Sequence, residues 1–252
     1  MKEPTLNAEP AVQRRLLDLQ DLDLQLDQVA HKRKSLPEHA AVAELGKEKS
    51  VVDRDLVTAD TEVSDLQREQ KKADTDVEQV RLRKARNQQR LDSGQVTSPK
   101  DLEGLQHEIV SLDRRISNLE DAELEVMERL EAAEAVQADL RTRADAFAGR
   151  QAELESARDA ALKELDEQRS SLGDQRAKVS VELPADLLTT YQKLRERNGG
   201  IGAAPLVGKR CMGCRMELNP SDLGRIKAAA PDVVLRCEEC GRILVRTPET
   251  KV

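Results

Sequence analysis

Apolar residues recur at alternating intervals of four and three over most of this chain, and this spacing restricts the fold more than any other feature. The repeat runs from Val52 to Val80, and after an interruption it resumes at Leu102 and continues to Val179. Such a repeat places apolar side chains on one stripe of a helix, and striped helices pair in a left-handed supercoil. The pattern therefore predicts two long coiled-coil helices.

The predicted seam also contains polar side chains. They occupy core-type positions of the second helix, at Glu123, Gln137, Gln151, Arg158 and Gln168. We expect loosely packed or hydrated layers there, because a buried polar group needs a hydrogen-bond partner or water.

Composition supports helices and argues against a compact core. The 252-residue chain has one Phe, one Tyr and no Trp, and 35% of its residues are charged. Globular cores lean on aromatic side chains for buried area, whereas charged, Leu-rich and Ala-rich chains are typical of coiled coils. No apolar run approaches the roughly 20 residues of a membrane helix. The opening MKEPTLNAEP lacks the apolar region of a secretion signal, so we expect a cytoplasmic protein.

The interruption of the repeat has the sequence of a helix-to-helix turn. Gly94 can end the first helix in the left-handed conformation. Thr97 or Ser98 can cap the second helix, and Pro99 suits its first turn. Helices joined by about six residues fold back antiparallel. We therefore predict a mainly α fold, a long antiparallel coiled-coil hairpin with its turn near residues 93–98.

Pro37 divides the first arm into predicted helices at residues 12–35 and 38–92, because proline cannot donate the helical hydrogen bond. Pairing the arms about the turn places residues opposite each other when their numbers add to roughly 191. Phe147 then lies beside Leu45. We expect a kink near Pro37, with these two side chains filling the adjacent space.

Four cysteines carry the strongest chemical signal. They form two C-x-x-C pairs, Cys211 with Cys214 and Cys237 with Cys240. Two thiolates three residues apart can both turn inward on a knuckle, and two knuckles make a tetrahedral site for one structural zinc ion. Gly241 follows the second pair, where positive φ relieves the turn. The alternative is a pair of disulfides or free thiols, and a reducing compartment disfavours the disulfides.

The surroundings of the cysteines predict a zinc ribbon. Strand-like segments at residues 205–207, 233–235 and 243–245 flank the two pairs. A short helix, Ala185–Arg197, precedes the ribbon, and its apolar face carries Leu187, Leu188, Tyr191 and Leu194. We therefore divide the chain into a coiled-coil hairpin at residues 1–184, a connecting helix at 185–198 and a zinc ribbon at 199–252.

Signals for catalysis are missing from the sequence. Four cysteine ligands fill a zinc coordination shell and leave no position for water or substrate. The histidines, His31, His39 and His107, fall in the coiled coil, where a solvated surface residue is the simplest interpretation and metal ligation the alternative. We therefore expect no enzyme and no small-molecule substrate.

Two basic regions are candidates for binding nucleic acid or a partner. The first lies near the hairpin turn, at Arg81, Arg83, Lys84, Arg86, Arg90 and Lys100. The second lies in the ribbon and includes Arg215 and Arg242. Solvated helix faces are the alternative interpretation. Without aromatic side chains among them, base stacking is nearly unavailable, so RNA binding here would depend on phosphate contacts.

Three segments resemble a known family. They are LLDLQDLDLQLDQVAHKRKSLPE (16–38), RNQQRLDSGQVTSPKDLEGLQHEI (86–109) and CMGCRMELNPSDLGRIKAAAPDVVLRCEECGRILV (211–245). Together they resemble the bacterial C4-type zinc-ribbon proteins with an N-terminal coiled-coil hairpin. One branch of that family is a flagellar regulator that binds an alternative sigma factor and flagellin messenger RNA.

The resemblance implies an adaptor rather than a catalyst. We expect a zinc-binding adaptor that docks a protein partner through its coiled coil or ribbon, in gene expression or its regulation. The alternative is an RNA-binding protein that acts through the basic regions. Because the arms of a hairpin satisfy each other's apolar seam, we expect an elongated monomer.

Overall fold

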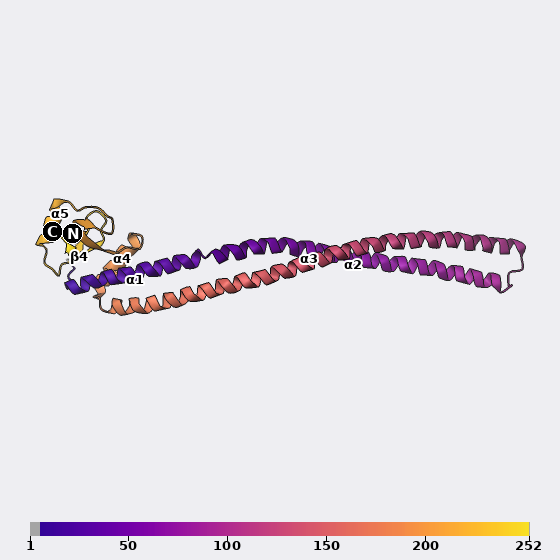
Figure 1. The fold of residues 1–252 in the computed structure, drawn as a ribbon, viewed down its shortest axis with the longest axis horizontal. Helices are drawn as coiled ribbons and strands as arrows, with labels where there is room; N and C mark the ends of the chain where they lie inside the picture. Colours follow the sequence, from indigo (N-terminus) through magenta and orange to yellow (C-terminus); the bar gives the residue numbers. More distant parts are fainter. Residues whose placement is uncertain (1–5, 252) are drawn as a thin grey trace. The chain divides into compact units, whose positions relative to one another are not determined.

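The structure is a computed structural model that describes residues 6–251, and most of these residues are helical (Figure 1). Its elements are α1 (Pro10–Lys34), α2 (Pro37–Asp92), α3 (Pro99–Val181), α4 (Ala185–Arg197), β1 (Ala203–Gly208), β2 (Arg210–Cys211), α5 (Pro220–Ala228), β3 (Leu235–Arg236) and β4 (Ile243–Thr250).

The chain packs as two compact units. One unit comprises the described residues up to His39 together with Ser156 onward, and the other comprises Ala40–Glu155. The first unit holds α1, the end of α3, α4 and the ribbon, and the second holds most of α2 and α3. The boundaries predicted at residues 184 and 198 follow changes of element type rather than packing, and they stay predictions.

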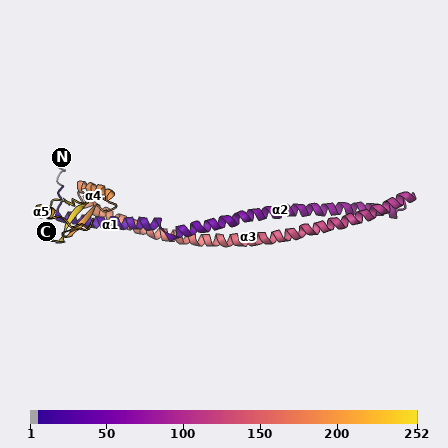
Figure 2. The ribbon, with the colours of Figure 1, turned by 90° about the horizontal axis from the view of Figure 1, so that it is seen from above.

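The unit Ala40–Glu155 is an antiparallel helical hairpin. Helices α2 and α3 lie side by side in both views of the ribbon (Figures 1 and 2). Helix α2 ends at Asp92, Gly94 follows with φ of 68°, and α3 begins at Pro99. The predicted turn and the left-handed glycine are both confirmed.

Side chains of the predicted apolar seam form the interior of this hairpin. The buried members are Val52, Ala59, Val63, Leu66 and Val77 of α2 and Leu105, Leu112, Val126, Leu130, Ala133 and Leu140 of α3. Asn87 is also buried, at 8% exposure, although its polar side chain was not predicted there. The polar side chains at seam positions differ from one another in burial, since Glu123 and Gln137 are half-buried and Gln168 is exposed.

The two helices are offset from the register predicted by counting from the turn. Asp60, predicted to face about residue 131, pairs with Arg141 at 3.0 Å. Phe147 was predicted to lie beside Leu45, but it packs with the cluster of Val52, Ala59 and Leu140. Val52, the first α2 residue of this cluster, is seven residues after Leu45. Packing of the seam layers sets the register, whereas the turn only fixes where the chain reverses.

The predicted interruption at Pro37 is present in the first unit. Helix α1 ends at Lys34 and α2 begins at Pro37, so proline occupies the start of a helix, where its missing N–H is not needed. Helix α1 lies against the C-terminal part of α3, where Asp23 of α1 and Arg176 of α3 form an ion pair of 2.6 Å. Arg15 of α1 also pairs at 2.9 Å with Glu182, the residue that follows α3.

Within the described residues, the ribbon contains a four-stranded sheet in the order β2-β1-β4-β3. Strands β1 and β4 are parallel, with Ala203 opposite Ile243, and each edge strand is antiparallel to its neighbour. The strands predicted at residues 205–207 and 243–245 are confirmed. The strand predicted at residues 233–235 is displaced, because β3 covers Leu235–Arg236 and overlaps the prediction only at Leu235.

Two features of the ribbon were not predicted. Helix α5 lies between the knuckles, with Pro220 at its start and Asn219 accepting a hydrogen bond from the Asp222 N–H. The beginning of the chain also joins the ribbon, since the Ala8 N–H donates to the Asp232 carbonyl and the Val234 N–H donates to the Leu6 carbonyl. This pairing anchors the start of α1 to the ribbon.

Candidate metal centre and its junction with the helices

The two cysteine knuckles have the same backbone geometry. In the first, the Arg215 N–H donates to the Cys211 carbonyl at 2.7 Å, and in the second, the Gly241 N–H donates to the Cys237 carbonyl at 2.8 Å. Arg215 and Gly241 have φ values of 62° and 71°. The left-handed position was predicted for Gly241 and missed for Arg215, because a non-glycine residue gives no signal for it.

The four thiols converge in a geometry that fits one zinc ion. All four sulfur atoms lie within 4.8 Å of one another. The Sγ atoms of Cys211 and Cys240 are 3.9 Å apart, as are those of Cys214 and Cys237. A zinc–sulfur bond of about 2.3 Å gives tetrahedral edges of about 3.8 Å, whereas a disulfide needs about 2.05 Å. The donors therefore match a C4 zinc site and not a pair of disulfides.

The thiols lie in an environment where their deprotonated forms need a cation for stabilisation. Burial raises the pKa of the Cys211 and Cys237 thiols, because a thiolate is poorly solvated there. Burial also acts against the Cys240 thiolate. Hydrogen bonds from the backbone and side chain of Arg242, together with those from Cys237 and Cys214, outweigh it and lower the Cys240 pKa to about 7. A bound zinc ion would stabilise all four as thiolates.

Arg242 packs beside the first knuckle and hydrogen-bonds to the segment that follows α4. Its guanidinium donates to the Ile201 carbonyl at 3.0 Å and to the Asn198 carbonyl at 2.9 Å. Its aliphatic stem crosses Gly213, where an added Cβ would lie 2.7 Å from the Arg242 Cδ. Gly213 is therefore required by close packing, and Arg242, which was predicted as a binding residue, connects the second knuckle to the end of α4.

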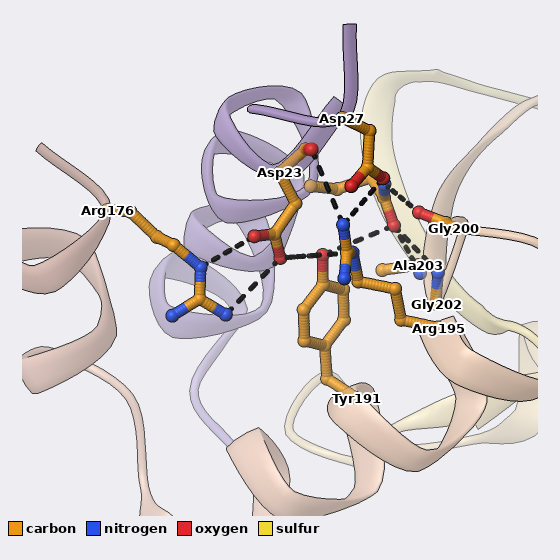
Figure 3. A network of polar contacts seen from close by, with 9 residues as sticks. Asp23, Asp27, Arg176, Tyr191, Arg195, Gly200, Gly202 and Ala203 are labelled. Atoms are coloured by element: carbon orange, nitrogen blue, oxygen red, sulfur yellow. Dashed lines mark hydrogen bonds and ion pairs between the residues drawn. The ribbon is translucent and has the colours of Figure 1, made fainter. Parts of the chain in front are cut away.

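A buried polar network joins the helices to the ribbon (Figure 3). At its centre is Asp23 of α1, which is only 2% exposed. Its carboxylate accepts hydrogen bonds from Arg176 of α3 at 2.6 Å and from the hydroxyl of Tyr191 of α4 at 2.8 Å. Arg195 of α4 completes the network through a 2.6 Å bond to Asp27. A buried carboxylate needs such partners to offset its desolvation.

Gln20 extends this network into the ribbon. Its side-chain oxygen accepts the Gly202 N–H at 2.7 Å, and its amide donates to the Gly200 carbonyl at 2.8 Å. Gly202 is also constrained, because an added Cβ would lie 2.6 Å from the Tyr191 carbonyl oxygen. The first unit is therefore tied together by hydrogen bonds from α1 to the residues that precede β1.

Sequence reasoning missed the polar part of this junction. Tyr191 and the apolar face of its helix were identified, and Leu187, Tyr191 and Leu194 are buried. Asp23 and Gln20 gave no signal, because in an amphipathic helix they resemble ordinary surface residues. Only their burial against partners more than 150 residues away reveals their role.

The basic residues predicted near the turn fall into two groups. Three form ion pairs across the hairpin, Arg81 with Glu120 at 2.5 Å, Arg83 with Glu108 at 2.6 Å, and Lys84 with Asp113. Arg86 donates to the Leu82 carbonyl of its own helix. Arg90 and Lys100 border a hollow of about 570 Å³ at the turn and have no ion pair within residues 6–251.

Several basic side chains of the ribbon are also engaged within the chain. Arg246 donates to the carbonyls of Ala230 and Pro231, and Arg225 forms ion pairs with Asp222 and Glu238, both at 2.7 Å. Arg215, by contrast, is exposed on the first knuckle. Much of the predicted positive surface is therefore compensated locally.

Two family descriptions match this chain. Residues 19–199 match a CT398-like coiled coil hairpin domain, and residues 210–244 match a C4-type zinc ribbon domain. None of the helices within residues 6–251 combines the length and apolarity that crossing a bilayer demands.

Relatives and solved structures agree with these matches. A solved structure from Mycobacterium smegmatis is 36% identical, with a TM-score of 0.84 over 96% of this chain and 100% of that one. CT398 of Chlamydia trachomatis is 17% identical, with a TM-score of 0.67 over 94% of this chain and 98% of that one, and it shares the fold. Two uncharacterized proteins of Mycobacterium tuberculosis, from strains CDC 1551 / Oshkosh and H37Rv, are 43% identical over 86 residues. That match covers 34% of this chain and 35% of each relative.

Proposed function

Since the chain belongs to the CT398-like coiled-coil hairpin family and carries a C4-type zinc ribbon, we propose that it is a non-catalytic adaptor that docks a protein partner. The zinc ion has a structural part in this proposal. Four converging cysteines occupy every position of a tetrahedral shell, so the metal organises the ribbon and offers no site to a substrate.

One observation favours a protein over RNA as the partner. The basic side chains at the turn and in the ribbon largely direct their donors to groups of this chain, as in the ion pairs of Arg81, Arg83 and Arg225. A surface that binds RNA through phosphates needs cations that are free of such pairs. The chain also carries a net charge of −7, which repels nucleic acid.

We further propose that the partner acts in gene expression or its regulation. The support for this is the resemblance of the segments at residues 16–38, 86–109 and 211–245 to the zinc-ribbon family described above. The flagellar role of one branch of that family is not part of the proposal.

Affinity capture from the native cells tests the adaptor function. Tagged full-length protein is recovered with and without nuclease treatment, and co-purifying molecules are identified. We expect a stoichiometric protein partner that persists after nuclease. Recovery of RNA alone, or loss of every protein after nuclease, would reject the adaptor in favour of RNA binding.

RNA binding is the second candidate. Arg90 and Lys100 at the turn favour it, because neither has an ion pair among the residues that the structure describes. A filter-binding salt titration with single-stranded RNA tests this alternative. Phosphate-led binding should be detectable at about 50 mM salt and weaken steeply as salt rises. Its absence at low salt would remove the alternative.

A further inference from the structure

A cleft of about 1020 Å³ lies between α4 and the ribbon, within the first packed unit. Part of its lining, referred to below as the floor, is aliphatic. Leu194 of α4 and Ile226 of α5 are buried there, while Leu6, Val234 and Leu235 are half-buried and leave part of their surface in the cleft. Apolar surface in a concave site favours an apolar ligand, because burying it releases water.

The α4 wall of this cleft is electrically polarised. Asp186 lies in its first turn, and Lys193 and Arg197 lie one turn apart near its C-terminal end. Both cations are exposed and have no ion pair in the part of the chain that the structure describes. Across the cleft, Arg225 is held by Glu238. Arg236 also lines the cleft, and Lys193 and Arg197 are the two cations that α4 presents to a ligand.

We propose that this cleft docks an amphipathic peptide segment of a partner protein that carries acidic residues at one end. Apolar side chains of the segment would cover Leu6, Val234 and Leu235, and its carboxylates would pair with Lys193 and Arg197. This proposal rests on the adaptor function and names the surface and the chemistry that recognise the partner.

Two features favour a peptide over RNA in the cleft. The floor is aliphatic, and neither Phe147 nor Tyr191 lines it, so bases would find no stacking platform. An amphipathic peptide can instead cover the aliphatic floor with apolar side chains and pair its carboxylates with Lys193 and Arg197, as peptides do in helix-in-groove complexes.

Selection from a random peptide library tests the proposal with the zinc-loaded, full-length protein. We expect enriched peptides to combine spaced apolar residues with clustered Asp or Glu at one end. One labelled peptide is then titrated by fluorescence anisotropy. The double variant Lys193→Glu/Arg197→Glu should weaken binding at least tenfold, because it replaces two attractive charges with repulsive ones. A peptide with its acids changed to Lys should restore binding to that variant.

The matched control is Lys209→Glu/Lys227→Glu, which makes the same change of charge in the ribbon outside the cleft. Its affinity should stay within twofold of the native value. Enrichment of peptides without acidic residues, failure to enrich any binder, or equal losses in both variants would overturn the proposal. The proposal would also be overturned if an oligouridine bound more tightly than any peptide and if the Lys193→Glu/Arg197→Glu variant lost this oligouridine binding.

These results separate the cleft from the adaptor function. If affinity capture yields a nuclease-resistant partner that the Lys193→Glu/Arg197→Glu variant still retains, the adaptor function stands and the cleft proposal is wrong. If no protein partner is captured at all, the adaptor function itself is wrong.

Discussion

At the scale of single residues, Tyr191 shows how one side chain connects separate elements. Its ring is fully buried against the apolar cluster that includes Leu16, Leu19 and Ile243, and its hydroxyl reaches Asp23. The phenol therefore supplies both packing and a buried hydrogen bond, a combination that suits tyrosine at a junction. No other aromatic side chain lies in this cluster among the described residues.

The titration of Tyr191 is the first prediction. Burial and then the hydrogen bond to Asp23 raise the pKa of the phenol above its usual value of 10. Since the folded pKa is the higher one, this contribution to stability is present below pH 10 and is lost as pH rises further. Absorbance at 295 nm should show no ionisation near pH 10 while the protein is folded. Reversible ionisation near pH 10 with unchanged circular dichroism would contradict the buried position.

Gly213 gives the second prediction. The change Gly213→Ala should destabilise the ribbon by about 1–3 kcal/mol, because its Cβ would displace Arg242. Competition with a chelator should show faster zinc loss. Gly224→Ala is the control, since nothing lies within 4 Å of its added Cβ, and in helix α5 it should be neutral or stabilising by up to about 1 kcal/mol. Equal zinc retention in the two variants would argue against close packing at Gly213.

At the scale of elements, helices α2 and α3 are held by an apolar seam with polar layers inside it. Glu123 of α3 is half-buried, and its carboxyl group hydrogen-bonds to Asp74 of α2. Two carboxyl groups in contact cannot both ionise freely, so this contact, reinforced by burial, raises the pKa of Glu123. The layer is therefore more favourable when one proton is shared.

The third prediction follows from this pair. Because the folded pKa of Glu123 is raised, its stabilising effect is present below the ordinary value near 4.5 and is lost as pH rises above it. The melting temperature of the native protein should therefore fall relative to that of Glu123→Gln as the pH rises from about 4 to about 7. Glu125→Gln, at an exposed neighbouring site, should show no such trend. A pH-independent difference for Glu123→Gln would contradict the carboxyl pair.

At the scale of the whole molecule, the chain combines long helices with a small sheet that carries the four-cysteine site. Helices α1, α2 and α3 contain 25, 56 and 83 residues, whereas α4 and α5 contain 13 and 9. The cluster around the thiols combines the four cysteines with aliphatic side chains, among them Leu206, Ile226 and Leu244. Because the four cysteines form part of this cluster, we expect the ribbon to depend on its metal and the hairpin on its seam.

Zinc removal is the fourth prediction. Chelation should unfold the ribbon and leave most of the helical circular dichroism signal, because the long helices lie outside the metal site. Amide hydrogen exchange should rise in β1 and β4 and stay slow at seam residues such as Val63 and Leu130. Loss of the whole helical signal on chelation would show that the hairpin needs the metal as well.

The sequence predicted the elements that local patterns encode. Heptad spacing identified the seam, Gly94 and Pro99 the turn, and the four cysteines the metal site, because each depends on neighbours a few residues away. The register of the hairpin and the Asp23 network depend on contacts over more than 75 residues, so spacing alone could not reveal them. Helix α5 was missed because nine residues give too short a pattern.

The metal shell is the most direct test of the account that this chain works by binding rather than by chemistry. X-ray absorption spectroscopy and metal analysis of protein purified without chelator should find one zinc per chain with four sulfur ligands at about 2.3 Å. Replacing Cys211 and Cys214 with Ser should abolish this signal. A shell that contains oxygen or nitrogen, or less than about half an equivalent of zinc, would contradict the closed structural site.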